Sequence, residues 1–277
     1  MVESFSTGKT SSGNDDVLVC SGTWFGVVDG ATDKSGLTYP LEGVETGAGA
    51  FAAAVVAKAV SGLPAGVDPL SGVRRVSAAL RDAVEAHHPG IGAHERPCAS
   101  LIVLDGSCDR LWWCGDAQAA WVLRDGQVRV HRPVKSVDRI AADFRAAVLA
   151  ARDAAGLGGD GRDAGRAAAL ELLRYAPALA NGTHQEFSYG VVDGSAPPAW
   201  AVGTTFLGDA VEVVLASDGY PETVFGGRLG RLGDAEAHLA EELAADPGCV
   251  GVLRSTKGLA AGADSFDDRT WLRLRRR

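Results

Sequence analysis

Aspartates stand where apolar, strand-like segments begin or end. Asp29 follows FGVV, Asp116 follows LWWC after one glycine, and Asp218 follows VVLAS. Asp267 precedes TWLRL, and Asp16 opens DVLVC. Because strand ends of a packed sheet lie close together, we expect these carboxylates to cluster, and clustered carboxylates repel unless a cation neutralises them. Oxygen ligands without His or Cys favour magnesium, manganese or calcium over zinc.

A single aspartate before a glycine at a strand end is more simply explained as a turn residue. Asp105 and Asp125 are interpreted in this way, since no wider pattern surrounds them. Asp125-Gly126 is typical of a two-residue hairpin turn. The prediction of a metal centre therefore depends on the set of five aspartates and not on any one of them.

Other nucleotide-binding and hydrolase motifs are incomplete or missing. Gly8-Lys9-Thr10 resembles the end of a phosphate-binding loop, but Glu3 stands where the first glycine belongs, and no strand is expected before it. The glycines of GAGAFA at 47–52 lie in an apolar helix, where small residues serve packing. Neither GxSxG nor HExxH occurs. The five cysteines include no CxxC pair, which argues against a disulfide scaffold and a cysteine zinc site.

The elements that must position the aspartates alternate between strand-like and helical periods. Short apolar runs between turns predict strands within 16–29, 99–131, 186–218 and 270–274. Helical periodicity is expected at 44–61, 69–87, 138–178, 233–246 and 249–260. This order predicts an α+β fold with antiparallel sheets. No repeat or linker divides the chain, so a single domain over 1–277 is expected.

Composition limits the classes of function. The chain has 277 residues, of which 46% are hydrophobic and 22% charged, enough to bury a core. Its net charge of −8 argues against a nonspecific nucleic-acid binder and against an anionic membrane surface. No apolar run reaches about 18 residues, and no targeting segment is recognised. We therefore expect a cytoplasmic protein.

Six motifs occur in the order that characterises one family. They are NDD at 14–16, VVDGA at 27–31, CASLIVL at 98–104, WWCGDAQAAWV at 112–122, VVLASDG at 213–219 and DDRTWLRL at 267–274. The chain thereby resembles the metal-dependent protein phosphatases of the 2C family, in their bacterial form. The resemblance implies a four-layer α-β-β-α sandwich, with two central antiparallel sheets flanked by helix pairs.

The resemblance also implies a centre of two Mn²⁺ or Mg²⁺ ions, with a third ion as an option. Asp29 would bridge two ions, the carbonyl of Gly30 would bind one of them, and Asp218 and Asp267 would hold the second. Such a pair of ions activates a water for direct attack on phosphorus. Asp29, Asp218 and Asp267 are therefore the expected catalytic residues.

Two further aspartates complete the ligand set that the resemblance implies. Asp16 would act through bound water, and Asp116 would serve the third, weaker metal site. The arginine that binds phosphate in the family is missing, since Ser11 stands at about that position. Lys9, two residues earlier, is a candidate substitute. The alternative is a solvated lysine near the N-terminus.

The region 131–200 departs most from the family. Where the family has its substrate-facing flap, this chain has two helices rich in Ala and Arg, and then a polar, turn-rich segment. Asn181 and His184, with Gln185 and Tyr189, form a patch that is a candidate for substrate contact. Ala31 stands where eukaryotic members carry a proposed general acid, so His184 is a candidate acid. An ordinary surface loop is the alternative.

The leading hypothesis is a metal-dependent phosphomonoester hydrolase acting on phosphoserine or phosphothreonine in proteins. The same residues also suit a small phosphorylated metabolite, and the unusual flap region leaves this open. A non-catalytic 2C-like domain that binds a phosphoprotein or a regulator is the alternative from another class. The retained aspartates favour an enzyme, because uncompensated carboxylates are costly to keep together.

Overall fold

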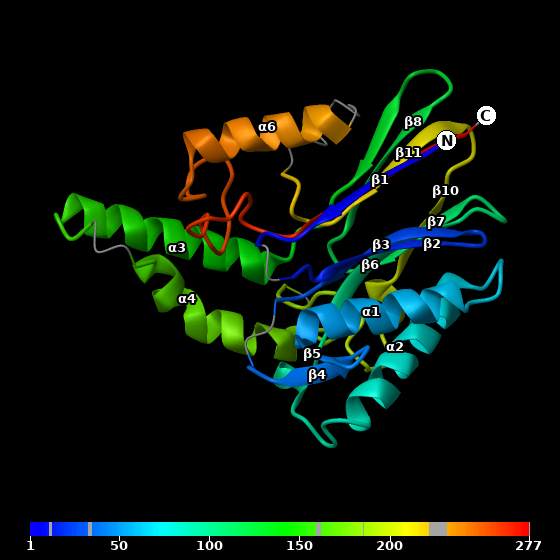
Figure 1. The fold of residues 1–277 in the computed structure, drawn as a ribbon, viewed down its shortest axis with the longest axis horizontal. Helices are drawn as coiled ribbons and strands as arrows, with labels where there is room; N and C mark the ends of the chain where they lie inside the picture. The colour runs from blue at the N-terminus through cyan, green and yellow to red at the C-terminus, as the bar shows by residue number, and fades with distance from the viewer. Residues whose placement is uncertain (11–12, 33–34, 159–161, 185, 222–231, 277) are drawn as a thin grey trace.

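Two five-stranded antiparallel sheets form the centre of the molecule (Figure 1). The computed structural model describes residues 1–10, 13–32, 35–158, 162–184, 186–221 and 232–276. The first sheet has the order β1-β12-β11-β8-β9 and is built from Val2–Thr7, Arg269–Arg275, Ala210–Ala216, Gln118–Leu123 and Val128–His131. The second has the order β10-β7-β6-β3-β2 and is built from Gly203–Phe206, Arg110–Cys114, Ala99–Asp105, Trp24–Gly30 and Asp16–Ser21.

The two sheets pack face to face through their apolar side chains. Val27 and Ile102 of the second sheet lie in one buried cluster with Leu215 and Leu272 of the first. The alternation of side chains along each strand directs the neighbouring residues to the opposite face, where the helices lie. Val28 and Val103, for example, belong to the cluster that faces α1 and α2.

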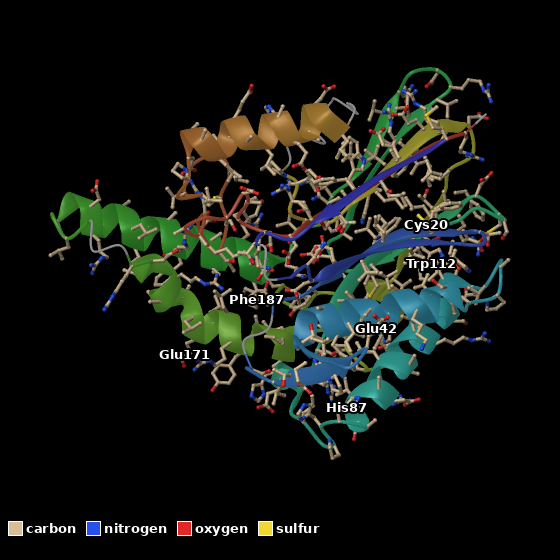
Figure 2. All side chains as sticks on the ribbon, in the orientation of Figure 1. Cys20, Glu42, His87, Trp112, Glu171 and Phe187 are labelled. Carbon is tan, nitrogen blue, oxygen red and sulfur yellow. The ribbon has the colours of Figure 1, made fainter. Side chains whose placement is uncertain are left out.

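Helices cover the outer faces of the sandwich. The helices α1 (Ala48–Ser61) and α2 (Pro69–Glu85) pack on the second sheet, with Trp112 between them and the strands (Figure 2). On the first sheet lies α6 (Leu232–Ala245), whose Ala235 packs with Trp271. The helices α3 (Ser136–Ala154) and α4 (Ala164–Tyr175) form a hairpin beside the sandwich (Figure 1). The predicted α+β class and four-layer sandwich are confirmed.

Several local expectations were wrong. Residues 2–7 form β1, so a strand does precede Gly8. It is an edge strand in which exposed and half-buried side chains alternate, so it contains no apolar run that would predict a strand. Thr38–Leu41 and Val44–Gly47 form a small hairpin, β4–β5, in place of a turn and a helix start. Residues 186–202 and 249–260 contain neither the strands nor the helix expected of them, among the residues that are described.

No described helix combines the length and the apolarity needed to cross a bilayer. The expectation of a single domain over 1–277 stays a prediction.

Candidate metal centre

The register of β2 and β3 brings the first two aspartates together. Asp16, the first residue of β2, lies opposite Asp29 near the end of β3. The amide of Asp16 donates to Asn14 Oδ1 at 2.9 Å, which fixes the entry into the strand. One oxygen of Asp16, Oδ2, is buried and has no hydrogen-bond partner. An unsatisfied buried carboxylate oxygen is costly, and it is the kind of atom that a bound cation or water satisfies.

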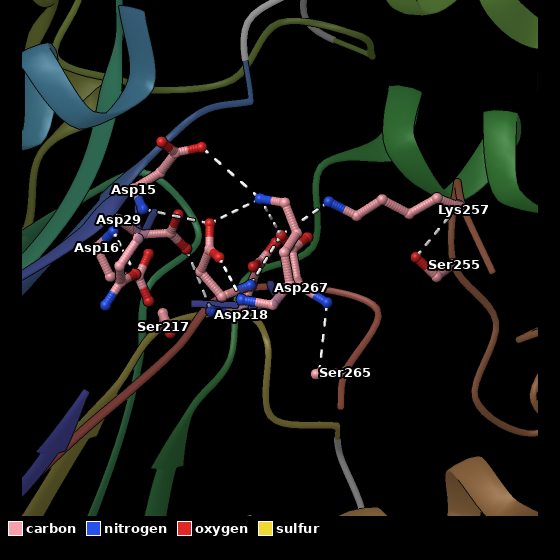
Figure 3. Close-up of polar contacts among 12 residues, drawn as sticks. Asp15, Asp16, Asp29, Ser217, Asp218, Ser255, Lys257, Ser265 and Asp267 are labelled. Atoms are coloured by element: carbon pink, nitrogen blue, oxygen red, sulfur yellow. Dashed lines mark hydrogen bonds and ion pairs between the residues drawn. The ribbon is translucent and has the colours of Figure 1, made fainter. Parts of the chain in front are cut away.

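The first sheet contributes Asp218 from the end of β11. The Asp218 amide donates to Asp29 Oδ2 at 3.3 Å, so strands of both sheets meet at this point (Figure 3). Ser217, the preceding residue, is fully buried and accepts a hydrogen bond from the amide of Thr270 in β12. This bond ties the end of β11 to the start of β12. The expected clustering at strand ends is therefore present.

Gly30 occupies a position where any side chain would clash. A Cβ at this residue would lie 2.3 Å from the carbonyl oxygen of Gly49 in α1 and 2.5 Å from that of Asp15. The Gly30 amide donates to the same Asp15 oxygen at 3.1 Å. The backbone of Gly30 is thus fixed between α1 and the residue before β2. This close approach lets Gly30 line the cavity beside Asp29 with its main chain alone.

Burial and mutual repulsion shift the protonation of these carboxyl groups. Burial, followed by the charges of Asp16 and Asp116, raises the pKa of Asp29 well above its ordinary value. Desolvation and then the charge of Asp29 do the same to the pKa of Asp218. Burial raises the pKa of Asp16 to about 7, although a hydrogen bond from Ser217 opposes this. The three carboxyl groups lack enough nearby positive charge, which favours a cation beside them.

Asp267 and its neighbour Asp268 are held by two lysines. Lys257 Nζ lies 2.8 Å from Asp267 Oδ1, and Lys9 Nζ lies 2.7 Å from Asp268 Oδ2 and 3.7 Å from Asp267 Oδ1. Lys9 also lies 3.7 Å from Asp15. Burial by itself would lower the pKa of Lys9, but the hydrogen bond to Asp268 and the surrounding carboxylates raise it. Lys9 therefore remains charged as part of an ion-pair network.

Asp116 is held by a third lysine. Its Oδ2 lies 2.9 Å from Lys135 Nζ, and its Oδ1 accepts a hydrogen bond from the Ser100 hydroxyl. Burial alone would raise the pKa of Asp116, but the charge and hydrogen bond of Lys135, together with Ser100, lower it below its ordinary value. Asp116 is thus ionised and fully paired, in contrast to Asp29 and Asp218.

A cavity of about 500 Å³ opens over the cluster. Four of the predicted site aspartates line it together with Gly30: Asp29, Asp116, Asp218 and Asp267. Its other wall comes from residues 132–143, from α4 and from residues 253–257. The basic side chains of this wall are Arg132, Lys135, Arg139, Arg166, Arg254 and Lys257. An acidic end next to a basic wall suits a cation-dependent reaction on an anionic substrate.

The predicted substrate-binding residues lie elsewhere. Lys9 does not line the cavity and faces Asp268. The side-chain amide of Asn181 donates to Val191 O at 2.8 Å and to Asp193 Oδ1 at 3.0 Å, so it holds its own loop together. His184 is exposed and does not line the cavity. Ser11 and Gln185 lie outside the described residues.

The donor set fits a divalent cation in part. Asp29, Asp218 and the unpartnered Asp16 Oδ2 supply oxygen ligands of the type that Mg²⁺ and Mn²⁺ prefer. In the described part of the chain, no three His, Cys, Asp or Glu side chains are gathered closely enough to hold an ion without moving. The lysine on Asp267 accounts for part of this, because an ion at Asp267 must displace Lys257.

Comparison with known proteins gives a structural relationship. No protein-family model matches the sequence, and no curated protein matches it significantly. Solved structures do match over the whole chain. The Mycobacterium tuberculosis serine/threonine phosphatase PstP/Ppp has a TM-score of 0.50 and 16% identity over 99% of this chain and 97% of that one.

Two other structures give the same result. The PstP catalytic domain in complex with two manganese ions has a TM-score of 0.50, with 17% identity over 99% of this chain and 96% of that one. A bacterial serine phosphatase carrying a point mutation has a TM-score of 0.52, with 10% identity over 100% of this chain and 98% of that one. The fold is therefore that of the bacterial 2C-type serine/threonine phosphatases, and the resemblance seen in the sequence is confirmed at the level of fold.

The three lysines were the main omission of the sequence interpretation. Lys135 and Lys257 were not singled out, and Lys9 was considered as a phosphate contact or a solvated side chain and not as an ion-pair partner of the aspartates. Lysine is rare here, with five in the chain, and three of them face this one acidic cluster. That scarcity was a usable signal, but spacing along the chain does not say which carboxylate a lysine will reach.

Proposed function

We propose that this protein is a metal-dependent phosphomonoester hydrolase that acts on phosphoserine or phosphothreonine in proteins. The observation that carries the proposal is the convergence of Asp29 and Asp218 at a cavity, with the buried, unpartnered Asp16 Oδ2 beside them. No salt bridge to a described residue compensates these carboxyl groups when they ionise. The fold of the serine/threonine phosphatases supports the same activity.

The residues proposed to hold two Mn²⁺ or Mg²⁺ ions are Asp29, the carbonyl of Gly30, Asp218, Asp267 and Asp16. When bound, such a pair supplies an activated water and stabilises the charge on a transferring phosphoryl group. The chain contributes orientation: the Asp218 amide holds Asp29, and the clash at Gly30 fixes the neighbouring backbone. Asp267 would serve as a ligand only if an ion replaced its Lys257 partner.

The substrate side of the proposal concerns the basic wall. The side chain of Arg139 is exposed at the cavity, and Arg254 lies near it with Asp143 as its partner. Such side chains suit the acidic surroundings of a phosphorylated residue in a protein chain. His184 is exposed and does not line the cavity, which does not support it as the proton donor for the leaving group.

A non-catalytic domain that binds a phosphoprotein or regulator is the second candidate. It is favoured by the lysines, because ion pairs to Asp116 and Asp267 compensate part of the acidic cluster without any metal. The argument that retained carboxylates imply an enzyme therefore rests on Asp16, Asp29 and Asp218. None of these three forms a salt bridge with a residue in the described ranges.

Hydrolysis of p-nitrophenyl phosphate separates the two candidates. We expect turnover that requires Mn²⁺ or Mg²⁺ and stops in EDTA. Asp29→Asn should lower turnover by at least about 100-fold, because it would remove a charged oxygen from the proposed metal ligands. Asp125→Asn is the matched control, since Asp125 caps an exposed hairpin turn where asparagine fits equally well. Full turnover in EDTA, or in Asp29→Asn, would contradict the proposal.

Substrate class is decided by turnover on two panels in parallel. One panel contains phosphoserine and phosphothreonine peptides, and the other contains sugar phosphates and nucleotides. We expect kcat/KM to be higher for the peptides by at least about tenfold, which corresponds to about 1.4 kcal/mol of transition-state binding. A clear preference for the metabolite panel would show that the basic wall serves a small phosphorylated molecule instead.

A further inference from the structure

Lys135 ends the segment between β9 and α3 and points into the acidic cluster. Its Nζ lies 2.9 Å from Asp116 Oδ2, and the two side chains are only 15% and 9% exposed. The ammonium group also lies over the ring of Tyr189, 5.3 Å from its centroid. A lysine that is this enclosed, with a carboxylate and an aromatic face as partners, is held as a fixed positive charge.

The carboxylate on the other side of this pair has no remaining freedom. Asp116 Oδ1 accepts a hydrogen bond from the hydroxyl of Ser100, while Oδ2 forms the ion pair with Lys135. The backbone that carries it passes Ser100 so closely that a Cβ at Gly115, which has φ of 109°, would lie 2.3 Å from Ser100 Oγ. Both oxygens of Asp116 are therefore used by protein groups, and a metal ion there would have to displace the lysine.

Charge balance points the same way. Seven aspartates lie next to one another at the strand ends: Asp15, Asp16, Asp29, Asp116, Asp218, Asp267 and Asp268. Asp138 of α3, whose charge also acts on Lys135, is not counted among them. The ammonium groups of Lys9, Lys135 and Lys257 offset three of the seven. Four negative charges remain, and two divalent ions balance them. A third divalent ion would leave an excess of positive charge in an enclosed site, which is unfavourable.

We propose that Lys135 supplies, beside Asp116, the positive charge that a third metal ion would otherwise bring, so that this centre binds two divalent ions. The inference rests on the proposed function, because it takes the two ions at Asp29 and Asp218 as given. It replaces the expectation that Asp116 serves a third ion. Asp116 then acts as a positioning residue that holds the ammonium at the cavity, where Lys135 is a lining residue.

The number of bound Mn²⁺ ions tests this without any measurement of activity. The metal-stripped protein is dialysed against 0–10 mM MnCl₂, so that the highest concentration is roughly 100 times the Kd of a site with a Kd of about 0.1 mM. Bound Mn²⁺ is then counted by electron paramagnetic resonance. We expect two ions for the wild type and three for Lys135→Met, in which Asp116 is free to bind. Lys58→Met, at an exposed position on α1, is the matched control and should bind two.

Two further variants guard against a loss of folding in Lys135→Met. Lys135→Arg keeps the positive charge and should bind two ions. The double variant Asp116→Asn with Lys135→Met removes both charges of the pair and should fold and bind two ions, because no carboxylate is left for a third. Near-ultraviolet circular dichroism of each variant verifies the native packing before the titration.

The outcomes separate this inference from the proposed function. Three ions in the wild type, or two ions in a folded Lys135→Met, would overturn the role of Lys135 and leave the two-ion centre standing. No bound ion in the folded wild type would overturn the two-ion centre, and the inference with it. Two ions in the wild type, three in Lys135→Met and two in the double variant would support both.

Discussion

Asp16 is expected to make the metal-free protein less stable as the pH rises. Burial raises the pKa of this carboxyl from 3.8 to about 7, and the side chain is 5% exposed. Between these two values the folded protein holds a proton that the unfolded chain has released, so the free energy of unfolding falls with rising pH. At about 1.4 kcal/mol for each tenfold change in proton affinity, the full effect is about 4 kcal/mol.

The substitution Asp16→Asn removes this titration. Between pH 5 and the pKa of Asp16, which lies about two pH units higher, the free energy of unfolding of the wild type should fall by about 3 kcal/mol. The stability of Asp16→Asn relative to the wild type should therefore increase by about 3 kcal/mol between pH 5 and pH 8. Urea unfolding in EDTA, followed by tryptophan fluorescence, measures the difference at each pH.

A control and an added ion sharpen this test. Asp125→Asn, at the exposed hairpin turn, should track the wild type at both pH values. Millimolar Mn²⁺ at pH 8 should stabilise the wild type more than Asp16→Asn, because the ion neutralises the ionised carboxylate. If the wild type and Asp16→Asn kept a constant difference from pH 5 to pH 8, the carboxyl would have an ordinary pKa and the argument would fail.

Three other substitutions test separate parts of the structure. Gly30→Ala should lower the free energy of unfolding in urea by about 1–3 kcal/mol, because its Cβ would lie 2.3 Å from a carbonyl oxygen of α1. Gly47→Ala is the control and should change it little, because a Cβ there meets nothing within 4 Å. Equal decreases for the two variants would contradict this reasoning. Lys257→Met should lower the half-saturating Mn²⁺ concentration by about 2–5-fold, because it frees Asp267, and an unchanged titration would argue against that exchange. Arg145→Met should lower the free energy of unfolding by about 3 kcal/mol. The guanidinium of Arg145 is buried, 2% exposed, and donates hydrogen bonds to one carboxylate and three main-chain carbonyls. A decrease below about 1 kcal/mol would refute its bridging role.

The fold was predictable from the sequence where burial imposes a clear period. The apolar runs that became β3, β6, β7 and β11 lie in the core of the sandwich, and the charged stripe over 69–87 became α2. The edge strand β1 was missed, because half-exposed positions tolerate Glu and Ser and leave no apolar pattern. The apolar runs within 186–202 suggested strands where the described residues form no strand, since an apolar run alone does not supply a pairing partner.

The candidate site was predictable in its aspartates and not in their partners. Asp29 and Asp218 stand at strand ends, and strand ends of packed sheets meet, so their proximity follows from topology. Lys135 and Lys257 reach the cluster from segments without sheet structure, whose course depends on tertiary packing. Asn181 illustrates the converse: a polar residue in a polar loop suggested binding, but its amide satisfies the loop's own carbonyl and carboxylate groups.

The position of β12 has a consequence for how the protein is made. This strand comes last in the chain order and yet lies inside the first sheet, between β1 and β11. Until it has left the ribosome, β1 has no described strand to pair with. Ser217 then also lacks the hydrogen bond from the Thr270 amide, and Lys9 lacks its ion pair with Asp268. A growing chain can pair β2, β3, β6 and β7 of the second sheet and cover them with α1 and α2 early, before β10 and β12 are made. The acidic cluster can therefore assemble only after residues 267–275 have been made, long after Asp16 and Asp29.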